Sequence, residues 1–293
     1  MSHYEEAVRI AKTLQDLDGP NVNPVCHTRL YTHGGRVERS LVLLHGFTNC
    51  PQQMDALGHA MFERGWNVVI PRYPRHGYTD RLNTSIAELR ADHLIAVANR
   101  SVLAGAGLGE RLTVAGLSLG AILAGLMAQT NEGIERAVLI APMLGLKPIP
   151  GPVMNAMSRL AARAPNFYIW WNGDLKDRLG PAYGYPRFAT RAYAALFQTG
   201  RQLVDAARRN PPRARSIAVV TNAAEPRLDN RFTYRLIKSW RRHGADVETF
   251  EFPASDRLPH DLIDPGNTGL AKRARDRVYE VVTQLIIGPT GGS

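Results

Sequence analysis

The stretch Gly116-Leu117-Ser118-Leu119-Gly120 decides how this chain folds. Residues 112–115, just before it, form a short apolar and β-branched run that is typical of a buried strand. Residues 121–128 follow it with the alanine and leucine content of a helix. A Gly-x-Ser-x-Gly turn between a strand and a helix indicates a nucleophile elbow, in which the glycines make room for the tight turn. The serine then stands at a helix N-terminus, beside free N–H groups that can hold an oxyanion. The alternative is a plain glycine-rich turn.

The length of 293 residues and the hydrophobic share of 44% fit one large α/β domain with an insertion, or two domains. The longest apolar runs are of strand length, and residues 1–6 lack the basic and apolar regions of an export signal. We therefore expect a cytoplasmic protein. The spacing of the two cysteines, Cys26 and Cys50, suits neither a metal site nor a redox motif, so we expect free thiols rather than a disulfide.

The chain is strongly basic, with a formal net charge of +10 that comes mainly from arginine. The arginines are scattered, apart from small groups such as Arg208-Arg209 and Arg241-Arg242, and no nucleic-acid motif accompanies them. We therefore expect a solvated basic surface and no nucleic-acid partner. Contact with an anionic membrane surface is the alternative.

Apolar periodicity and turn residues divide most of the chain into alternating strands and helices. Helices are expected at residues 4–17, 52–64, 86–106, 230–243 and 268–287, and strands at 26–31, 36–44, 66–70, 112–115, 136–140, 216–221 and 247–252. The first two strands are separated by a hairpin-like turn at residues 32–35. This alternation predicts a mostly parallel sheet with helices on both faces. It stops at residues 143–191, which are rich in proline, glycine and aromatic residues and indicate an insertion.

A serine is a poor nucleophile without a base beside it and a third group that orients the base. The chain offers these groups in the order serine, acid, histidine. His260 lies in a loop after the last expected strand and is the candidate base. Glu225, a few residues beyond the strand at 216–221, is the candidate acid. Asp229 is its rival, although it precedes a helix and is typical of an N-cap, and Asp256 is a third candidate.

The negative charge of a tetrahedral intermediate needs two N–H donors. We expect the amide of Leu119, which follows the serine, and the amide of Phe47, in the loop after the strand at 36–44. His45 and His76 are expected to shape loops near the site rather than to react. Asp261 and Asp264, beside the candidate base, are expected to cap the following helix.

These motifs together resemble the α/β-hydrolase superfamily, and in particular its small, capped serine esterases and lipase-like members. The resemblance rests on His45-Gly46-Phe47, Pro74-Arg75-His76-Gly77, Gly116 to Gly120, Glu225-Pro226 and Leu258-Pro259-His260-Asp261. The acid departs from the pattern, because aspartate is commoner there. The resemblance implies an α/β-hydrolase core over residues 1–142 and 192–293, and a cap over residues 143–191 that covers the serine. Aromatic side chains of this cap would wall an apolar acyl pocket; these are Phe167, Trp170, Trp171 and Tyr185.

The sequence thus predicts a serine hydrolase that cleaves carboxylic esters through an acyl-enzyme, as a carboxylesterase or small lipase. Ser118 would attack, His260 would shuttle the proton and Glu225 would orient the base. We expect a small-molecule ester with an apolar acyl group as substrate, and neither a cofactor nor a metal. Two alternatives remain open: a catalytically silent binding or regulatory protein with this fold, and an interfacial lipase at anionic membranes. Chain length, alcohol preference, thioesterase or amidase activity, oligomeric state and pathway are left open as well.

Overall fold

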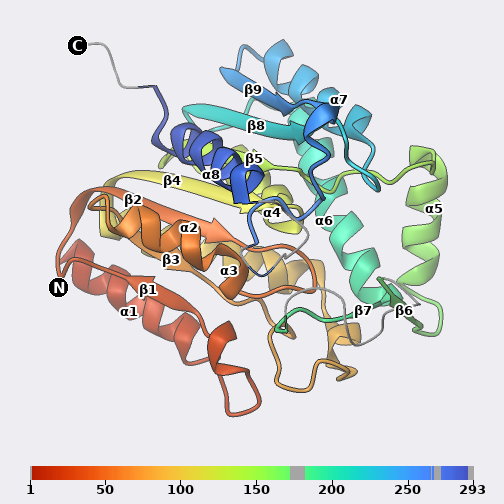
Figure 1. Ribbon diagram of the computed structural model, residues 1–293, viewed down its shortest axis with the longest axis horizontal. Helices are drawn as coiled ribbons and strands as arrows, with labels where there is room; N and C mark the ends of the chain where they lie inside the picture. The colour runs from red at the N-terminus through yellow and green to blue at the C-terminus, as the bar shows by residue number, and fades with distance from the viewer. Residues whose placement is uncertain (1, 172–181, 265, 267–271, 290–293) are drawn as a thin grey trace.

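The Gly-x-Ser-x-Gly turn sits in a seven-stranded sheet with the order β1-β3-β2-β4-β5-β8-β9 (Figure 1). A computed structural model describes residues 2–171, 182–264, 266 and 272–289. The strands of this sheet are β1 (Arg29–Tyr31), β2 (Val37–Leu44), β3 (Asn67–Ile70), β4 (Gly109–Leu117), β5 (Ile134–Ile140), β8 (Ser216–Asn222) and β9 (Val247–Phe252). Neighbouring strands are parallel except for β1, which pairs antiparallel with β3. The α/β fold with a mostly parallel sheet is therefore confirmed.

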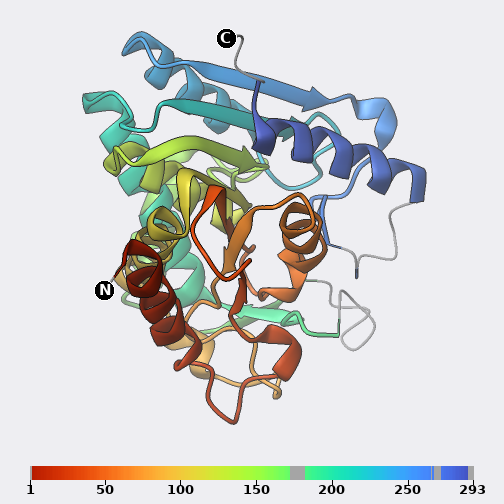
Figure 2. The same cartoon turned by 90° about the vertical axis from the view of Figure 1, so that its left-hand side faces the viewer.

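Helices cover both faces of the sheet (Figures 1 and 2). They are α1 (His3–Gln15), α2 (Gln52–Phe62), α3 (Ala91–Leu108), α4 (Leu119–Thr130), α5 (Gly151–Ala161), α6 (Thr190–Arg209), α7 (Asn230–Arg242) and α8 (Lys272–Ile287). Short 3₁₀ helices lie at Pro24–Cys26, Ser85–Glu88 and Ala254–Asp256. Alternate residues of β2 enter two separate apolar cores: Leu41 and Leu43 pack with α2 and α8, and Val42 and Leu44 pack with the helices of the other face. Burial on both faces explains why the central strands are continuous apolar runs.

The expected pairing of the first two strands is wrong. β1 pairs with β3, and β3 separates it from β2. The side chain of Asn67, at the start of β3, accepts from the amide of His33 at 2.9 Å and donates to the carbonyl of Gly35 at 2.8 Å. Residues 32–35 therefore pass across the end of β3 and connect β1 on one side of it with β2 on the other, so they form a crossover and not a hairpin.

Residues 143–191 contain structure that composition did not reveal. They hold α5, the start of α6, and a separate two-stranded antiparallel ribbon of β6 (Tyr168–Trp170) and β7 (Arg187–Ala189). The expected last helix begins at Lys272, and residues 268–271 of that expectation lie outside the described residues. In the part of the chain that the structure describes, no helix combines the length and apolarity that crossing a membrane requires.

The expectation of two free thiols is wrong, because Cys26 and Cys50 form a disulfide. The two residues are 24 positions apart, yet the fold brings their Cα atoms to 5.2 Å, within the range that a disulfide needs. Both are fully buried. The bond joins the segment before β1 to the loop after β2. Disulfides persist mainly in oxidising compartments, so the pairing does not support the expectation of a cytoplasmic protein.

Candidate active site

Ser118 occupies a strained backbone conformation at the junction of β4 and α4. Its φ of 59° and ψ of −109° are rare for a residue with a side chain. A Cβ atom on Gly116 would lie 2.2 Å from the carbonyl oxygen of Gly120, and one on Gly120 would lie 1.9 Å from that of Leu44. Only glycine fits at both positions, and the turn between them presents the serine hydroxyl at the carboxyl edge of the sheet.

The structure brings Ser118, His260 and Glu225 into one hydrogen-bonded chain. His260 Nε2 lies 2.9 Å from Ser118 Oγ, and His260 Nδ1 lies 2.9 Å from Glu225 Oε2. The three residues follow β4, β9 and β8 respectively. These strands are parallel, so their carboxyl ends meet at one edge of the sheet. Residues separated by as many as 142 positions therefore meet at this edge.

Glu225 is buried, with 2% of its surface exposed, and its second oxygen is also satisfied. Oε1 accepts from the backbone amides of Arg227 at 3.1 Å and Leu228 at 3.3 Å. Burial by itself would raise the pKa of Glu225, but the hydrogen bond and charge of His260, together with these two amides, lower it below its ordinary value. Glu225 is therefore ionised at neutral pH, and an ionised carboxylate requires the proton of a neutral His260 on Nδ1. Nε2 is then free to accept the proton of Ser118.

The two rival acids are engaged elsewhere. Asp229 caps α7 through the amide of Arg231 and pairs with the guanidinium of the same residue at 2.7 Å. Asp256 pairs with Arg277 at 2.9 Å. Of these three described carboxylates, Glu225 is the one that contacts His260.

Two amides are expected to bind an oxyanion, and both lie close to Ser118 in the fold: Leu119 directly follows it, and Phe47 lines the pocket over it. Leu119 is the first residue of α4, and Phe47 lies in the loop after β2. Neither N–H has an acceptor among the residues that the structure describes. The amide next to Phe47, that of Gly46, donates instead to Gln53 Oε1 at 2.7 Å. Gln53 Nε2 donates in turn to Asp261 Oδ1 at 2.7 Å, so this buried side chain links the loop after β2 to the loop that carries the histidine.

His45 and His76 are buried parts of the scaffold, as expected. The ring of His45 stacks on Tyr73 at 3.8 Å, and its Nδ1 lies 2.9 Å from the carbonyl of Gly46. Burial lowers the pKa of His45 well below its ordinary value and lowers that of His76 to about 4. Both rings are neutral at physiological pH, and neither has a hydrogen bond to Ser118.

Asp264 accepts from Tyr183 and Asn49 and from the amide of Gly266. The described part of α8 begins at Lys272, so the start of the helix that Asp261 and Asp264 were expected to cap lies outside the described residues. Burial raises the pKa of Asp261 to about 7, and the charge of Asp264 adds to this shift. Sequence patterns did not predict the contacts of Asp261 and Asp264, because their partners come from the loop after β2, from α2 and from residues near β7.

A pocket of about 310 Å³ opens over Ser118 and His260. Its apolar walls include Phe47, Met143, Leu146, Trp171, Tyr193 and Leu228. Of the four aromatic residues expected here, Trp171 and Tyr185 line the pocket. Phe167 is 63% exposed, and Trp170 lies on β6 with its ring 5.9 Å from the guanidinium of Arg187. The structure does not bring these two to the pocket.

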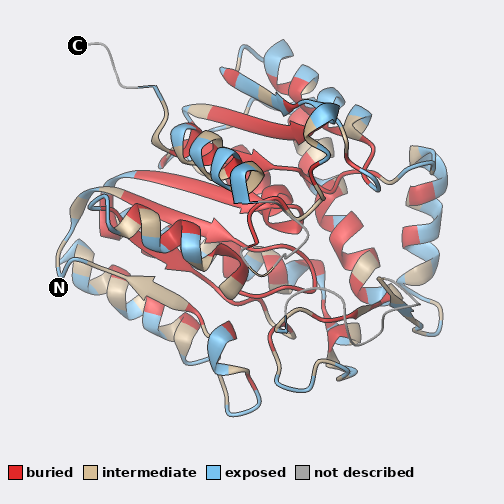
Figure 3. Cartoon of the chain, viewed as in Figure 1, coloured by how far each residue is buried: buried red, intermediate tan, exposed pale blue. Residues whose placement is uncertain are grey.

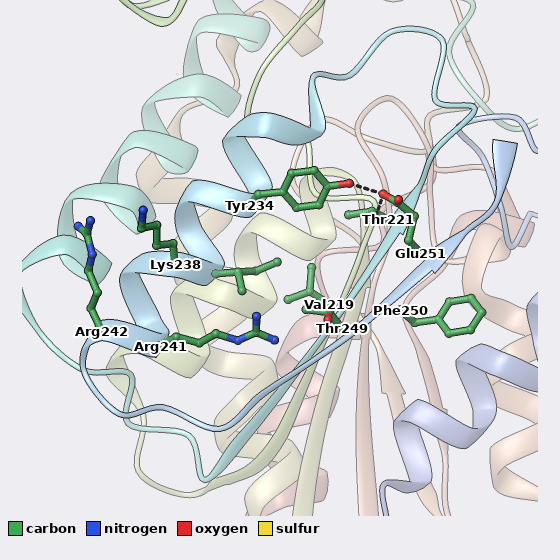
Figure 4. A pocket seen from close by; sticks show the side chains of 10 residues that line it. Val219, Thr221, Tyr234, Lys238, Arg241, Arg242, Thr249, Phe250 and Glu251 are labelled. Atoms are coloured by element: carbon green, nitrogen blue, oxygen red, sulfur yellow. Dashed lines mark hydrogen bonds between the residues drawn. The ribbon is translucent and has the colours of Figure 1, made fainter.

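A larger hollow of about 680 Å³ lies between α7 and the edge of the sheet at β8 and β9 (Figure 4). Tyr234 and Thr221 donate to the carboxylate of Glu251 at one end, and Arg241 donates to the carbonyl of Val247. Lys238 and Arg242 lie toward the other end (Figure 4). Its lining residues include no serine, cysteine or histidine, whereas Ser118 and His260 line the smaller pocket.

The sheet order, the strained serine turn and the two loops beyond β8 and β9 define an α/β hydrolase. Residues 41–278 match the model of the alpha/beta hydrolase family, and the chain belongs to that family. No curated protein sequence matches the chain.

Solved lipases and esterases share the fold. A structure reported for LipS and LipT, two metagenome-derived lipolytic enzymes, is 18% identical, with a TM-score of 0.65 over 88% of this chain and 99% of its own. The monoacylglycerol lipase of Paleococcus ferrophilus is 16% identical, with a TM-score of 0.62 over 89% and 98%. A soluble variant of the Saccharomyces cerevisiae monoglyceride lipase, in complex with a substrate analog, is 13% identical, with a TM-score of 0.66 over 89% and 91%. At these identities the likeness concerns the fold.

Proposed function

We propose that this α/β hydrolase cleaves carboxylic esters, with Ser118 as nucleophile, His260 as general base and Glu225 as the group that orients the base. The observation that carries the proposal is the hydrogen-bonded chain from Glu225 through His260 to Ser118, with 2.9 Å at both contacts of the imidazole. Such a chain activates a hydroxyl that is otherwise unreactive.

The proposed reaction has two halves. Ser118 Oγ attacks the ester carbonyl while His260 Nε2 takes its proton, and the oxyanion binds the amides of Phe47 and Leu119. Collapse of this intermediate breaks the bond to the alcohol oxygen, which takes the proton from His260, and leaves an acyl-enzyme. Water then attacks the acyl group with His260 as base, and the carboxylic acid leaves Ser118 free again.

The substrate we propose carries an apolar acyl group. The pocket over Ser118 is walled mainly by apolar and aromatic side chains, and its volume of about 310 Å³ lies at the small end of ligand pockets. We propose that residues 143–191 form a cap over the serine, because Met143, Leu146, Trp171 and Tyr185 of this segment line the pocket. The structural neighbours named above are lipolytic enzymes and monoacylglycerol lipases, which fits a substrate of this class.

The test is hydrolysis of p-nitrophenyl esters of graded acyl length by the wild type and by Ser118→Ala. We expect kcat to fall about 10⁴-fold or more in the variant, because the remaining groups cannot form an acyl-enzyme. Ser239→Ala is the matched control and should keep wild-type turnover, because Ser239 is half-buried on α7 and its hydroxyl donates to the carbonyl of Arg235 in the same helix. A folded Ser118→Ala protein with wild-type turnover would overturn the proposal, and so would a wild type that is inactive on every ester tested.

A further inference from the structure

The helix α5 turns an apolar side to solvent. Val153, Met157 and Leu160 recur at the i, i+4 and i+7 spacing of one helix face and are 49%, 53% and 70% exposed. The buried residues of α5, Met154 and Ser158, lie on an adjoining face, where Ser158 Oγ donates to the carbonyl of Ala194 in α6 at 3.4 Å. The exposed stripe is therefore not the surface that holds α5 to the protein, and Figure 3 shows much of this outlying helix in the colour of exposed residues.

Two further exposed apolar side chains follow α5 in the chain. Phe167 and Ile169 are 63% and 47% exposed, and they sit just before and within β6. Trp171, two residues beyond Ile169, lines the pocket over Ser118. We name the set Val153, Met157, Leu160, Phe167 and Ile169 the outer apolar face. Isolated exposed apolar residues are ordinary, but such a set on one short stretch of chain indicates a contact surface.

The described chain around the outer apolar face is rich in basic side chains. The described residues from 143 to 204 include no aspartate or glutamate, and they include six basic side chains: Lys147, Arg159, Arg163, Arg187, Arg191 and Arg201. None of these six forms an ion pair with a carboxylate among the described residues. Arg159 and Arg163 lie on and just after α5 and are exposed. Among the described residues, neither arginine has a carboxylate partner.

We propose that the outer apolar face docks on an anionic lipid surface, with the aliphatic and aromatic side chains entering the interface and the arginines meeting lipid phosphates. Insertion of apolar side chains and attraction to anionic headgroups reinforce each other in interfacial helices. A second copy of the chain fits this face less well, because two such faces would bring like charges together. Nucleic acid would use the arginines but would leave the aliphatic stripe in water.

Docking at this face would bring the stretch that carries Trp171 to the lipid. The proposed docking on lipid goes beyond the proposed function, since binding to a membrane requires neither turnover nor Ser118. The measurement is sedimentation of the full chain with vesicles of phosphatidylcholine containing 30% phosphatidylglycerol, against vesicles of pure phosphatidylcholine. Circular dichroism and thermal melting of each variant establish that it is folded, and hydrolysis of esters is assayed separately.

Met157→Gln/Leu160→Gln removes apolar contact without changing charge and should weaken partitioning into anionic vesicles at least tenfold. Arg159→Gln/Arg163→Gln should weaken it roughly ten- to thirtyfold at low salt, because each cation near an anionic surface is worth about a fivefold factor. Leu103→Gln is the matched control: Leu103 is 60% exposed on α3, a helix of the core layer, and its variant should bind as the wild type does.

Four results would overturn the proposal. The wild type could fail to sediment with anionic vesicles. Met157→Gln/Leu160→Gln could sediment with anionic vesicles as well as the wild type does. In 0.5 M NaCl, the wild type could bind vesicles of pure phosphatidylcholine as well as it binds the anionic vesicles. Finally, the wild type could be a dimer in solution that Met157→Gln/Leu160→Gln converts to a monomer, which would assign the outer apolar face to a second copy.

Discussion

The side chain of Gln53 offers a test of how the oxyanion donors are held. It is buried, its Oε1 accepts from Gly46 N at 2.7 Å, and its Nε2 donates to Asp261 at 2.7 Å. Gln53→Leu keeps a similar volume but leaves the Gly46 amide without an acceptor. An unsatisfied buried amide costs about 1–3 kcal/mol, and rotation of the His45–Gly46 peptide can relieve this cost, which also turns the adjoining peptide that carries Phe47 N–H.

A rotated peptide no longer points Phe47 N–H at the oxyanion position. Complete loss of one such donor costs about 2.7–4 kcal/mol of transition-state stabilisation, so partial displacement by Gln53→Leu should cost about 1–3 kcal/mol. That corresponds to a kcat lowered about 5- to 150-fold. KM should change little, because the oxyanion charge develops only in the transition state.

The assay is steady-state hydrolysis of a short p-nitrophenyl ester, with a thermal melt of each protein. Gln52→Leu is the matched control, because the neighbouring Gln52 accepts from Arg29 at 2.6 Å and has no hydrogen bond to Gly46. The reasoning is refuted if folded Gln53→Leu keeps wild-type kcat, if its whole effect falls on KM, or if Gln52→Leu loses as much activity.

Three other predictions follow from the same geometry. Glu225→Gln should lower kcat by a factor of about 10³ to 10⁴, since the amide no longer favours the Nδ1 proton of His260. Asp229→Asn should affect only the stability of α7. If Asp229→Asn lowers kcat more than Glu225→Gln does, the acid is Asp229. A pKa of about 7 means that Asp261 keeps its proton in the folded state while the unfolded chain loses it from 3.8 upward, so this group costs the wild type stability as pH rises from 4 to 8. Asp261→Asn has no carboxyl group to titrate at this position. Because Asp261 is partly exposed, we expect the free energy of unfolding of the variant in urea, relative to that of the wild type, to rise by about 1–2 kcal/mol between pH 4 and pH 8. A difference between the two proteins that does not change with pH would contradict the assignment. Cys26→Ser/Cys50→Ser should lose roughly 3 kcal/mol of unfolding free energy for a separation of 24 residues, and an unchanged urea midpoint would contradict this.

Local pattern was enough to predict the core of the fold. The strand at 247–252 is found with its expected bounds, and the helix after Ser118 begins where the glycines of the turn require. Such elements are specified by residues close in sequence, through apolar periodicity, glycine and caps. The pairing of β1 depends instead on Asn67, whose side chain meets residues about 30 positions earlier. No local signal carries that information.

The candidate site shows the same division. Ser118 and His260 could be selected by their positions after strands, and Glu225 by its distance from β8. Gln53 and the pair Asp261 and Asp264 could not, because their roles depend on partners from three separate segments. The aromatic residues of the insertion were selected by type, and β6 turns some of them away from the pocket: Trp171 lines it, while Phe167 faces solvent. The disulfide was missed for a similar reason, since a separation of 24 residues does not show that two Cα atoms lie 5.2 Å apart.

The most direct measurement is the site of covalent labelling by a fluorophosphonate, read by intact mass and by peptide mapping. Such a reagent phosphonylates a serine only when a neighbouring base takes its proton. We predict one adduct per chain, on the peptide that contains Ser118, formed rapidly by the wild type and at least a hundredfold more slowly when His260 is replaced by alanine. Absence of an adduct, an adduct on another serine, or labelling that does not depend on His260 would contradict the central claim that this hydroxyl is an activated nucleophile.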